Sequence, residues 1–561
     1  MNSKKSTLII LFLLTLLGGL LRFYKLTENP VSLNPDEVSF AYSAYSVLKT
    51  GKDEYGKFLP ITFKSVGDYK NPVPVYSLVL SEAVFGLNDF GERFPFAFFG
   101  TLAIPVLFFL AFQLTKNKNI AFLAAGMLVI SPWHVFYSRY GNDPPMGMVV
   151  ASLGLLFFLK MIEKRGIYTI LAAFFLVLSM YSYYSERVFI PLLFLLLITL
   201  FFGNLKKHLK STIVFLTASA IFVSLLVLRS FFGPDLARGN MVFIAKDVDY
   251  LRYIALDHVS PGLNLGGIHI EETFALLTLV VGRYLNYLQP DFLFFTGLNM
   301  THEGSLGLGV LYLFDLPLLI LGILELIKGK FPNRGLNTKY QVPLIFGWIA
   351  LSFIPAALTN NEHNAGRTIQ ALPMVLLISA IGFTKFIEFI RKMKQVYIKT
   401  AAVLFCGLFV LISLIHALIT YSVHFPVDRS EFSMKGNKEA VEYILANKEK
   451  YQEVVFDPFR GVDAPAIYSL PGYYILFYAK YDPALYQKEL IENEKKGISG
   501  FGQYRIRKIY WPNDRYAKDT LFVGSPWSLP LKDIKEEEIL KRIYLSNGQL
   551  ALLVVNPKPP K

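Results

Sequence analysis

The sequence predicts a polytopic α-helical membrane protein with a soluble α/β domain at its C-terminal end. Of its 561 residues, 53% are hydrophobic, and the mean hydropathy of +0.42 is high for a soluble protein of this length. Long apolar runs recur between short loops rich in lysine and arginine. The last segment, 422–561, is polar and lacks such runs, which indicates a separate soluble domain.

The apolar runs have the length that a membrane requires. A hydrocarbon core of roughly 30 Å is crossed by about 20 residues of helix, and helices satisfy their own backbone groups within lipid. The sequence predicts eleven spans, at residues 7–23, 94–114, 120–137, 146–162, 167–183, 188–203, 211–231, 305–327, 340–358, 368–387 and 400–421. The first run resembles a signal peptide, but no small-residue cleavage pattern follows it, so an uncleaved helix is expected.

The charges of the loops predict the orientation of these spans. Basic residues gather in alternate loops, whereas the three short loops between them hold one arginine each, namely Arg139, Arg187 and Arg367. Positive loops remain in the cytoplasm, so we expect a cytoplasmic N-terminus in a plasma membrane. Three long segments then face outward: 24–93, 232–304 and 422–561. Part of the second, 272–295, is apolar enough to lie along the membrane surface.

We therefore expect two domains, a membrane domain over 1–421 and an outward-facing α/β domain over 422–561. In the second domain, Asn547-Gly548 predicts a hairpin with a tight type I′ turn. The other elements expected there are a helix near 436–449 and β-strands at 453–457, 503–511 and 520–524.

Composition also excludes some functions. The net charge of +14 does not indicate nucleic-acid binding, because the basic residues punctuate apolar runs and form no single basic face. Cys406 is the only cysteine in the sequence, so no intrachain disulfide can form.

An acidic pair beyond the first span is the strongest sign of chemistry. In Asn34-Pro35-Asp36-Glu37, an N-cap asparagine, a proline at N1 and a glutamate at N3 predict a helix start with a capping box. This structural interpretation accounts for Asn34, Pro35 and Glu37. It leaves the Asp36 carboxylate as the candidate catalytic base.

Other charged residues lie at similar depth on the same predicted side. These are Lys70, Arg93, Arg139, Asp143 and Arg367. For each alone, a snorkelling side chain or a surface ion pair is the simpler explanation. Together, cations beside carboxylates at a membrane face suit a phosphate headgroup.

The order of these motifs supports a family resemblance. In the first 150 residues the chain contains Asp36-Glu37, Lys70-Asn71-Pro72, Arg93-Phe94-Pro95 with Gly100, Ser138-Arg139, and Asp143. This order resembles membrane glycosyltransferases of the protein O-mannosyltransferase and aminoarabinose-transferase type, which have the GT-C fold and include glycosyltransferase family 39. In layout the resemblance covers roughly residues 7–390.

The resemblance implies an enzyme that moves a sugar from a polyprenyl-phosphate carrier to an acceptor hydroxyl at the outer membrane face. The acceptor is a protein, a lipid or a glycan. Asp36 corresponds to the base, and Glu37 and Asp143 would orient the base or the acceptor. The lipid phosphate would be bound by Lys70, Arg93, Arg139 and Arg367. The chain departs from the family pattern at Asn71 and Val73, which interrupt the Lys-Pro-Pro order.

No ligand spacing demands a cofactor, so no metal site is assigned. Asp36, Asp143 and His302-Glu303 nevertheless offer ligands that a divalent metal accepts. The outward segments 232–304 and 422–561 carry aromatic residues suited to sugar stacking, so we expect them to select the acceptor or gate the site.

Three rival functions remain. A transporter or flippase of a lipid-linked saccharide would use the same cations, but it would also need ionisable groups near the bilayer centre, and the predicted spans hold few. An outward sensor would need one anchoring span rather than eleven. An oligosaccharyltransferase would carry a Trp-Trp-Asp motif in its tail, and the sequence has none.

Overall fold

The structure is a computed structural model that describes residues 3–65, 69–232, 264–265, 268–298, 307–329, 338–359 and 364–558, together with Ile244. The chain divides into two compact units. Unit 1 contains residues 1–24 and 96–418, and unit 2 contains residues 25–95 and 419–561. The predicted boundary between residues 421 and 422 falls just inside the second segment of unit 2. The grouping of residues 25–95 with that segment was not predicted.

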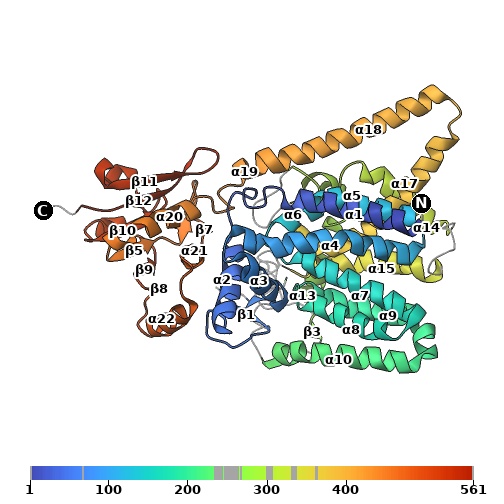
Figure 1. Cartoon of the computed structure of the whole chain (residues 1–561), viewed down its shortest axis with the longest axis horizontal. Coiled ribbons are helices and arrows are strands. Elements are labelled where there is room, and N and C mark those ends of the chain that lie inside the picture. Colours follow the sequence, from blue (N-terminus) through green and yellow to red (C-terminus); the bar gives the residue numbers. More distant parts are fainter. Residues whose placement is uncertain are drawn as a thin grey trace. The chain divides into compact units, whose positions relative to one another are not determined.

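Unit 1 consists almost entirely of helices (Figure 1). They are α1 (Ser3–Phe23), the later part of α4 (Asp89–Thr115), α5 (Lys118–Ile130), α6 (Pro132–Arg139), α7 (Pro144–Lys164), α8 (Ile167–Met180), α9 (Glu186–Lys207), α10 (Leu209–Phe232), α13 (Ile270–Asn286), α14 (Asp315–Ile327), α15 (Thr338–Ala357), α16 (Ala365–Thr368), α17 (Leu372–Lys392) and α18 (Val396–Ile419).

The described helices confirm a polytopic helical membrane protein. Eight stretches are long and apolar enough to span a membrane, and α5 with α6 makes a ninth if this pair, bent by 53°, is one span. Two further predicted spans correspond to the shorter helices α8 and α14, of 14 and 13 residues. The span predicted at 305–327 differs most, because its helix begins only at Asp315.

Two features of the sequence explain local geometry in this unit. The bend between α5 and α6 lies at Ser131-Pro132, where Ser131 leaves the helical conformation and proline cannot donate a helical hydrogen bond. Helices α14 and α17 approach closely at Gly322 and Gly382. A Cβ atom on Gly382 would lie 1.9 Å from the Leu318 carbonyl oxygen, so only glycine fits there.

Helix α13 covers most of the apolar stretch predicted to lie along the membrane surface at 272–295. Phe274, Leu277, Val281 and Leu285 lie one or two turns apart and are all exposed, whereas Arg283 is buried. The apolar stripe has the form of a helix lying at a membrane surface, and that location stays a prediction.

Unit 2 begins with residues 25–95, which we name the first outer segment after their predicted location. Its elements are α2 (Pro35–Thr50), the two-stranded β1 (Phe63–Lys64) and β2 (Tyr69–Lys70), α3 (Pro72–Phe85) and the first turns of α4. The C-terminal segment follows the end of α18 and contains strands β5 to β12, whereas the antiparallel pair β3 (Asn264–Leu265) and β4 (Ile268–His269) belongs to unit 1. Its elements are α19 (Phe425–Asp428), α20 (Asn437–Asn447), β5 (Glu453–Phe456), β6 (Phe459–Arg460), β7 (Ile467–Tyr468), α21 (Pro471–Tyr478), α22 (Pro483–Lys495), β8 (Gly500–Phe501), β9 (Tyr504–Ile506), α23 (Trp511–Asp514), β10 (Thr520–Gly524), β11 (Ile539–Tyr544) and β12 (Leu550–Val555).

A mixed six-stranded sheet forms the centre of the C-terminal segment, with the order β11-β12-β10-β5-β9-β8. Strands β10, β5 and β9 are parallel, and the outer pairs are antiparallel. Alternate residues of its strands enter two different cores, so that Val454 and Phe456 join one core and Val455 joins the other. The soluble α/β domain predicted for this segment is confirmed.

The hairpin predicted at Asn547-Gly548 joins β11 to β12. Its turn differs from the expected type I′. The Gly548 N–H donates to the Leu545 carbonyl, and Leu545 pairs with Gln549, so three residues form the loop. Within it only Gly548 has a positive φ, of 84°. This geometry is the common three-residue loop with glycine in the left-handed position.

The first outer segment and the C-terminal segment share one hydrophobic core within unit 2. Val38, Ala41 and Tyr42 of α2 pack in the same buried cluster as Tyr474 of α21 and residues of α20 and the sheet. The Tyr474 hydroxyl donates to the Leu33 carbonyl oxygen at 2.5 Å. Burial of apolar area stabilises this contact, and the fold of residues 25–95 therefore depends on the C-terminal segment.

The substitution Tyr474→Ala tests this dependence. It removes a fully buried aromatic ring, which typically lowers the free energy of unfolding by about 3–5 kcal/mol. We expect limited proteolysis to cut the loop after α2, around Gly51–Pro60, faster than in the wild type. Tyr544→Ala, at a half-exposed position on β11, is the control and should leave that loop protected. Faster cleavage confined to residues 419–561 would contradict a shared core.

Candidate functional site

The start of helix α2 has the capping geometry that the sequence predicts. The Asn34 side chain accepts from the Glu37 N–H at 3.0 Å, and the Glu37 carboxylate accepts from the Asn34 N–H at 2.7 Å. Pro35 occupies the first helical position, where a missing N–H has no cost. Glu37 is fully buried by this arrangement.

Arg93 holds the capping box and the chain that leads to it. Its Nε donates to Glu37 Oε1 at 2.8 Å, and both side chains are buried. The Nη atoms donate to the carbonyl oxygens of Leu26, Pro30 and Ser32, at 2.7–2.9 Å, and to Glu37 Oε2 at 3.4 Å. A guanidinium has five N–H groups, and these five contacts occupy all of them.

Arg93 was predicted to bind the lipid phosphate together with Lys70, Arg139 and Arg367. In this structure it has no N–H left to donate to a phosphate. Its contacts hold the loop before α2, and its role as a phosphate ligand stays a prediction. Glu37, predicted to orient the base, lies next to Asp36 in the chain and is the carboxylate partner of Arg93.

Asp36 differs from its neighbour in being exposed. It lies in the first turn of α2, where the helix dipole favours a negative charge. The capping box and Arg93 determine the backbone on both sides of it. The structure thus presents an accessible carboxylate on a fixed stretch of backbone, and its role as general base stays a prediction.

Lys70, on β2, lies in a buried cluster that packs against the same helix. Its Nζ donates to Ser43 Oγ at 3.0 Å and lies 4.0 Å from Glu54 Oε1. The ammonium also lies over the rings of Phe40 and Tyr473, with 5.3 and 5.6 Å to the centroids. Phe40 and Ser43 lie one and two turns of α2 beyond Asp36, so Lys70 contacts the helix face that begins at Asp36, roughly 6–10 Å further along the helix axis.

Glu54 completes this cluster and was not predicted from the sequence. Glu54 Oε1 accepts from Ser43 Oγ at 2.9 Å and from the Tyr473 hydroxyl at 3.3 Å. Burial raises the pKa of Glu54, and the nearby Lys70 charge lowers it by a smaller amount. A single glutamate in a loop carries no sequence signal. Its partners come from α2, β2 and α21, which only the fold brings together.

The other predicted residues belong to unit 1. Arg139 is buried, and its Nη1 donates to the carbonyl oxygens of Leu21 and Arg22 at 2.9 and 3.1 Å, which caps the C-terminal end of α1. Arg22 is also buried and bonds His134 Nδ1 at 2.8 Å. Gly100 allows this contact region to close, because a Cβ there would lie 2.4 Å from Ser138 Oγ.

Asp143 and Arg367 come from distant positions but lie in neighbouring elements of unit 1. Asp143 is half-buried and immediately precedes Pro144 of α7. Arg367 is half-buried in the short helix α16, where its Nη1 donates to Thr359 Oγ1. A Cβ on Gly366 would lie 3.3 Å from Pro144, so the residue before Arg367 packs beside the residue after Asp143.

The predicted site residues therefore form two groups. Asp36, Glu37, Lys70 and Arg93 belong to unit 2, and Arg139, Asp143 and Arg367 belong to unit 1. From the sequence, all seven were predicted to lie at similar depth on one side of the membrane.

The sequence offers Asp36, Asp143 and His302-Glu303 as ligands for a divalent metal. His302 and Glu303 lie outside the described residues. Within the part of the chain that is described, no group of three or more His, Cys, Asp and Glu side chains is placed to hold a metal ion. We derive no step through a metal.

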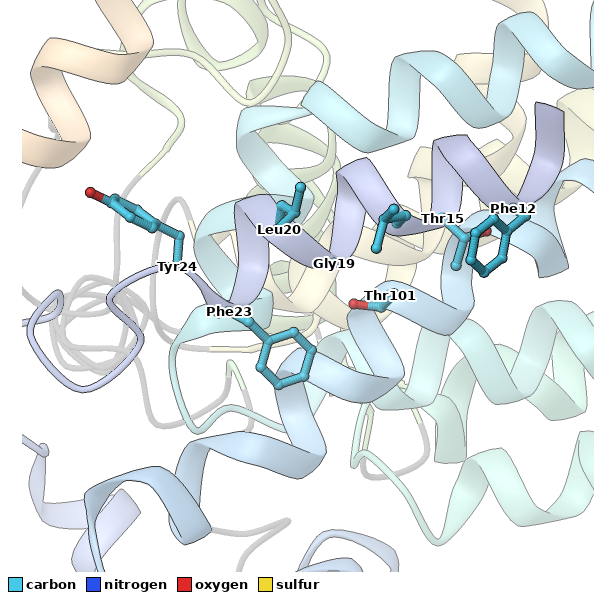
Figure 2. A pocket seen from close by; sticks show the side chains of 8 residues that line it. Phe12, Thr15, Gly19, Leu20, Phe23, Tyr24 and Thr101 are labelled. Atoms are coloured by element: carbon cyan, nitrogen blue, oxygen red, sulfur yellow. The ribbon is translucent and has the colours of Figure 1, made fainter. Parts of the chain in front are cut away.

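Unit 1 also contains an apolar groove between α1 and α4, with a volume of about 560 Å³ (Figure 2). Gly19 and Thr101 lie between the bulkier Phe12, Leu20 and Phe23. Thr15, which also lines the groove, and Thr101 each donate their hydroxyl to a carbonyl of their own helix, so neither hydroxyl needs a ligand. The lining is largely apolar, with the Tyr24 hydroxyl as a further polar group, and it suits hydrocarbon.

Comparison with known proteins supports a single class. A family model described as dolichyl-phosphate-mannose-protein mannosyltransferase matches residues 69–229, a stretch that contains Lys70, Arg93, Arg139 and Asp143. An undecaprenyl phosphate-α-4-amino-4-deoxy-L-arabinose arabinosyl transferase from Enterobacter sp. (strain 638) is 32% identical over 113 residues, 20% of each chain. An uncharacterised protein from Aquifex aeolicus is 33% identical over 133 residues, 23% of this chain and 26% of that protein. The chain thus matches about a quarter or less of the length of these curated relatives.

Solved structures resemble the chain over most of its length. ArnT from Cupriavidus metallidurans in the apo state has a TM-score of 0.53 at 11% identity, with 100% of both chains covered. The same protein bound to undecaprenyl phosphate gives 0.52 at 12% identity, covering 99% and 100%. The oligosaccharyltransferase AglB from Archaeoglobus fulgidus, in complex with an inhibitory peptide and a dolichol-phosphate, gives 0.52 at 14% identity, covering 94% and 70%.

The chain therefore has the GT-C fold. The resemblance to membrane glycosyltransferases of the protein O-mannosyltransferase and aminoarabinose-transferase type, first indicated by its motifs, is confirmed.

Glu54 predicts a measurable pH dependence of stability. Because its pKa is raised in the folded protein, the folded state holds a proton more tightly than the unfolded state. The stabilisation is complete below the ordinary glutamate pKa of about 4.5 and is lost as the pH rises through the raised value. Glu54→Gln removes this titration, so the variant should gain stability relative to the wild type as the pH rises above 4.5.

Thermal unfolding of both proteins in nanodiscs across this pH range measures the difference. Glu28→Gln, at an exposed position, should track the wild type. A constant difference between wild type and Glu54→Gln at all pH values would contradict the assignment.

Proposed function

We propose that the protein is a GT-C glycosyltransferase that moves a sugar from a polyprenyl-phosphate donor to an acceptor hydroxyl outside the membrane, with Asp36 as general base. The observation that carries this proposal is the exposed Asp36 carboxylate, next to a Glu37 fixed by Arg93. The fold and the matched family region support the same class. The relative that binds undecaprenyl phosphate and the relative that binds dolichol-phosphate support a lipid-phosphate donor.

The reaction balances with one base and no acid. The acceptor oxygen attacks the anomeric carbon of the donor sugar and loses its proton to Asp36. The bond between that carbon and the phosphate oxygen breaks, and its electron pair stays on the lipid phosphate. Attack opposite the leaving group inverts the anomeric centre. General-base help is typically worth ~10²–10⁴ in rate.

Cations would stabilise the charge that develops on the departing phosphate. Arg93 is fully occupied and Arg139 donates to backbone carbonyls, so we assign both to positioning. Lys70 and Arg367 remain the candidates for the phosphate. Lys70 contacts α2 at Phe40 and Ser43, on the helix face that begins at Asp36, and Arg367 is half-buried beside the loop that contains Asp143. We retain Asp143 as the residue that orients the acceptor.

The proposed function includes an orientation of the chain across the membrane. The charge pattern of the loops favours a cytoplasmic N-terminus, which puts residues 25–95 and 419–561 on the outer face of the plasma membrane. A sugar donor anchored in the bilayer by its lipid would reach a site at this membrane face directly.

The substitution Asp36→Asn tests the central assignment. Purified protein in nanodiscs is given undecaprenyl-phosphate aminoarabinose, polyprenyl-phosphate mannose and related radiolabelled donors one at a time, and sugar release is followed. We expect release by the wild type with one donor and a loss of about 10²–10⁴ in the variant, because the neutral amide cannot accept the proton. Asp463→Asn, at an exposed loop position in the same unit, is the matched control and should retain wild-type release.

Near-normal turnover by Asp36→Asn would contradict its role as base. Saturable donor binding by the wild type without cleavage, in the presence of acceptor-containing membrane extract, would favour the transporter or flippase instead. That rival shares the phosphate-binding cations but needs no base.

A further inference from the structure

A second cavity lies entirely within unit 2. Its volume is about 320 Å³, at the lower end of the roughly 300–1,000 Å³ of small-molecule sites. Tyr55 and Lys64 line it from the first outer segment. The other lining residues come from the C-terminal segment, and those that matter here are Tyr468, Tyr473, Tyr486, Glu494 and Phe501.

The aromatic walls of this cavity are held rigidly. The Tyr486 ring packs edge-on against Phe501, with centroids 5.3 Å apart at 89°, and against Tyr42 of α2 at 5.7 Å and 86°. Lys64 Nζ lies over the Tyr55 ring, 4.6 Å from its centroid. Such pairs fix ring orientation before any ligand arrives.

Besides the Tyr486 ring, Gln487 joins helix α22 to the first outer segment through hydrogen bonds. Gln487 Nε2 donates to the Asp53 carbonyl at 2.9 Å and to the hydroxyls of Ser46 and Thr50. Asp53 precedes Glu54 and Tyr55 in the chain. The walls contributed by the two segments are therefore held together by polar contacts as well as by the shared core.

The lining combines aromatic and polar groups, and this combination favours a neutral, partly polar ligand. Four tyrosines and a phenylalanine supply flat apolar faces, and Lys64 with Glu494 supplies one cation and one anion. Burial raises the pKa of Tyr55 to about 12, so its hydroxyl stays a neutral hydrogen-bonding group. Hydrocarbon would make no use of these polar groups, and a multiply charged ligand would meet a single opposing charge. A sugar ring has apolar C–H faces and hydroxyl edges that match both kinds of group.

The cavity also adjoins the Lys70 cluster. Tyr473 forms part of its wall, and the hydroxyl of this tyrosine donates to Glu54, which accepts from Ser43 beside Lys70. Lys70 Nζ lies 5.6 Å from the Tyr473 ring centroid. A ligand in the cavity is thus separated from the candidate phosphate-binding lysine by one aromatic side chain.

We propose that this cavity is a saccharide-binding site, and that it receives a sugar unit of the acceptor, which makes the acceptor a glycan or glycolipid. The first half stands on the cavity alone. The second half rests on the proposed function, because only a glycosyltransferase has an acceptor.

The binding half is tested without any donor. The full-length protein in nanodiscs is titrated with neutral disaccharides of glucose, mannose and N-acetylglucosamine and with a Ser/Thr-rich peptide, using tyrosine fluorescence and saturation-transfer NMR. We expect saturable binding of at least one disaccharide, weakened about tenfold by Tyr468→Ala and by Glu494→Gln. Tyr468 is 46% exposed, so its removal spares the core. Tyr544→Ala, an exposed tyrosine outside the cavity, is the control and should bind as the wild type does.

Absence of disaccharide binding, or binding that all three variants retain equally, overturns the proposal. Binding of the peptide alone, lost in Tyr468→Ala, overturns it in favour of a protein acceptor. The acceptor half is tested by adding the bound saccharide as a glycoside to the donor assay, where it should accept sugar in the wild type and lose this in Tyr468→Ala while donor hydrolysis persists. Saccharide binding without donor cleavage by any variant refutes the proposed function and leaves the binding site standing.

Discussion

Arg93 carries its charge where water cannot solvate it, and much of the candidate site depends on how that charge is balanced. The guanidinium is balanced by one carboxylate and three backbone carbonyls. Removing one partner of such a buried pair typically costs about 3–5 kcal/mol, because the other charge is left unpaired. Leu26, Pro30 and Ser32 belong to a loop without regular structure. The arginine therefore supplies the hydrogen bonds that a helix or strand would otherwise supply, and it thereby fixes the start of α2.

Because of this constraint, the adjacent residues Asp36 and Glu37 have different environments. Glu37 is withdrawn into the protein as a cap and counter-ion, and Asp36 is left at the surface on a helix whose first turn cannot shift. A base positioned in this way needs little reorganisation when a substrate arrives. The Lys70 cluster is fixed in a similar way further along α2. Glu54 and Ser43 hold the ammonium near the helix face that begins at Asp36. Because α2 shares its core with α21, the soluble C-terminal segment supports the candidate base and the walls of the second cavity together.

The sequence predicted whatever depends on hydropathy and local pattern. The apolar runs located the spans, the Asn-Pro-Asp-Glu pattern located the capping box, and β-like runs located β5 and β10 within a residue or two. The strand predicted at 503–511 is shorter, because β9 covers only Tyr504–Ile506. Contacts between residues that are far apart in the sequence could not be predicted. Nothing in the sequence shows that three loop carbonyls meet Arg93, so a residue identified as a phosphate ligand is instead saturated by the protein. Glu54 was missed for the same reason, because its partners are far apart in the chain. The bend at Ser131-Pro132 had a local signal in the proline, although a single span was predicted there.

Donor affinity and turnover, measured together on Arg93→Lys, test most directly whether Arg93 positions the base or binds the phosphate. Lysine keeps the charge but has three N–H donors on one atom, which cannot reach the set of acceptors that the guanidinium reaches. If Arg93 acts through α2, the affinity for undecaprenyl phosphate stays within about twofold of the wild type while sugar transfer falls by tenfold or more, and retained lipid binding shows that the variant is folded. An affinity loss as large as that of Lys70→Met, with turnover at saturating donor unchanged, would contradict this account and make Arg93 a phosphate ligand.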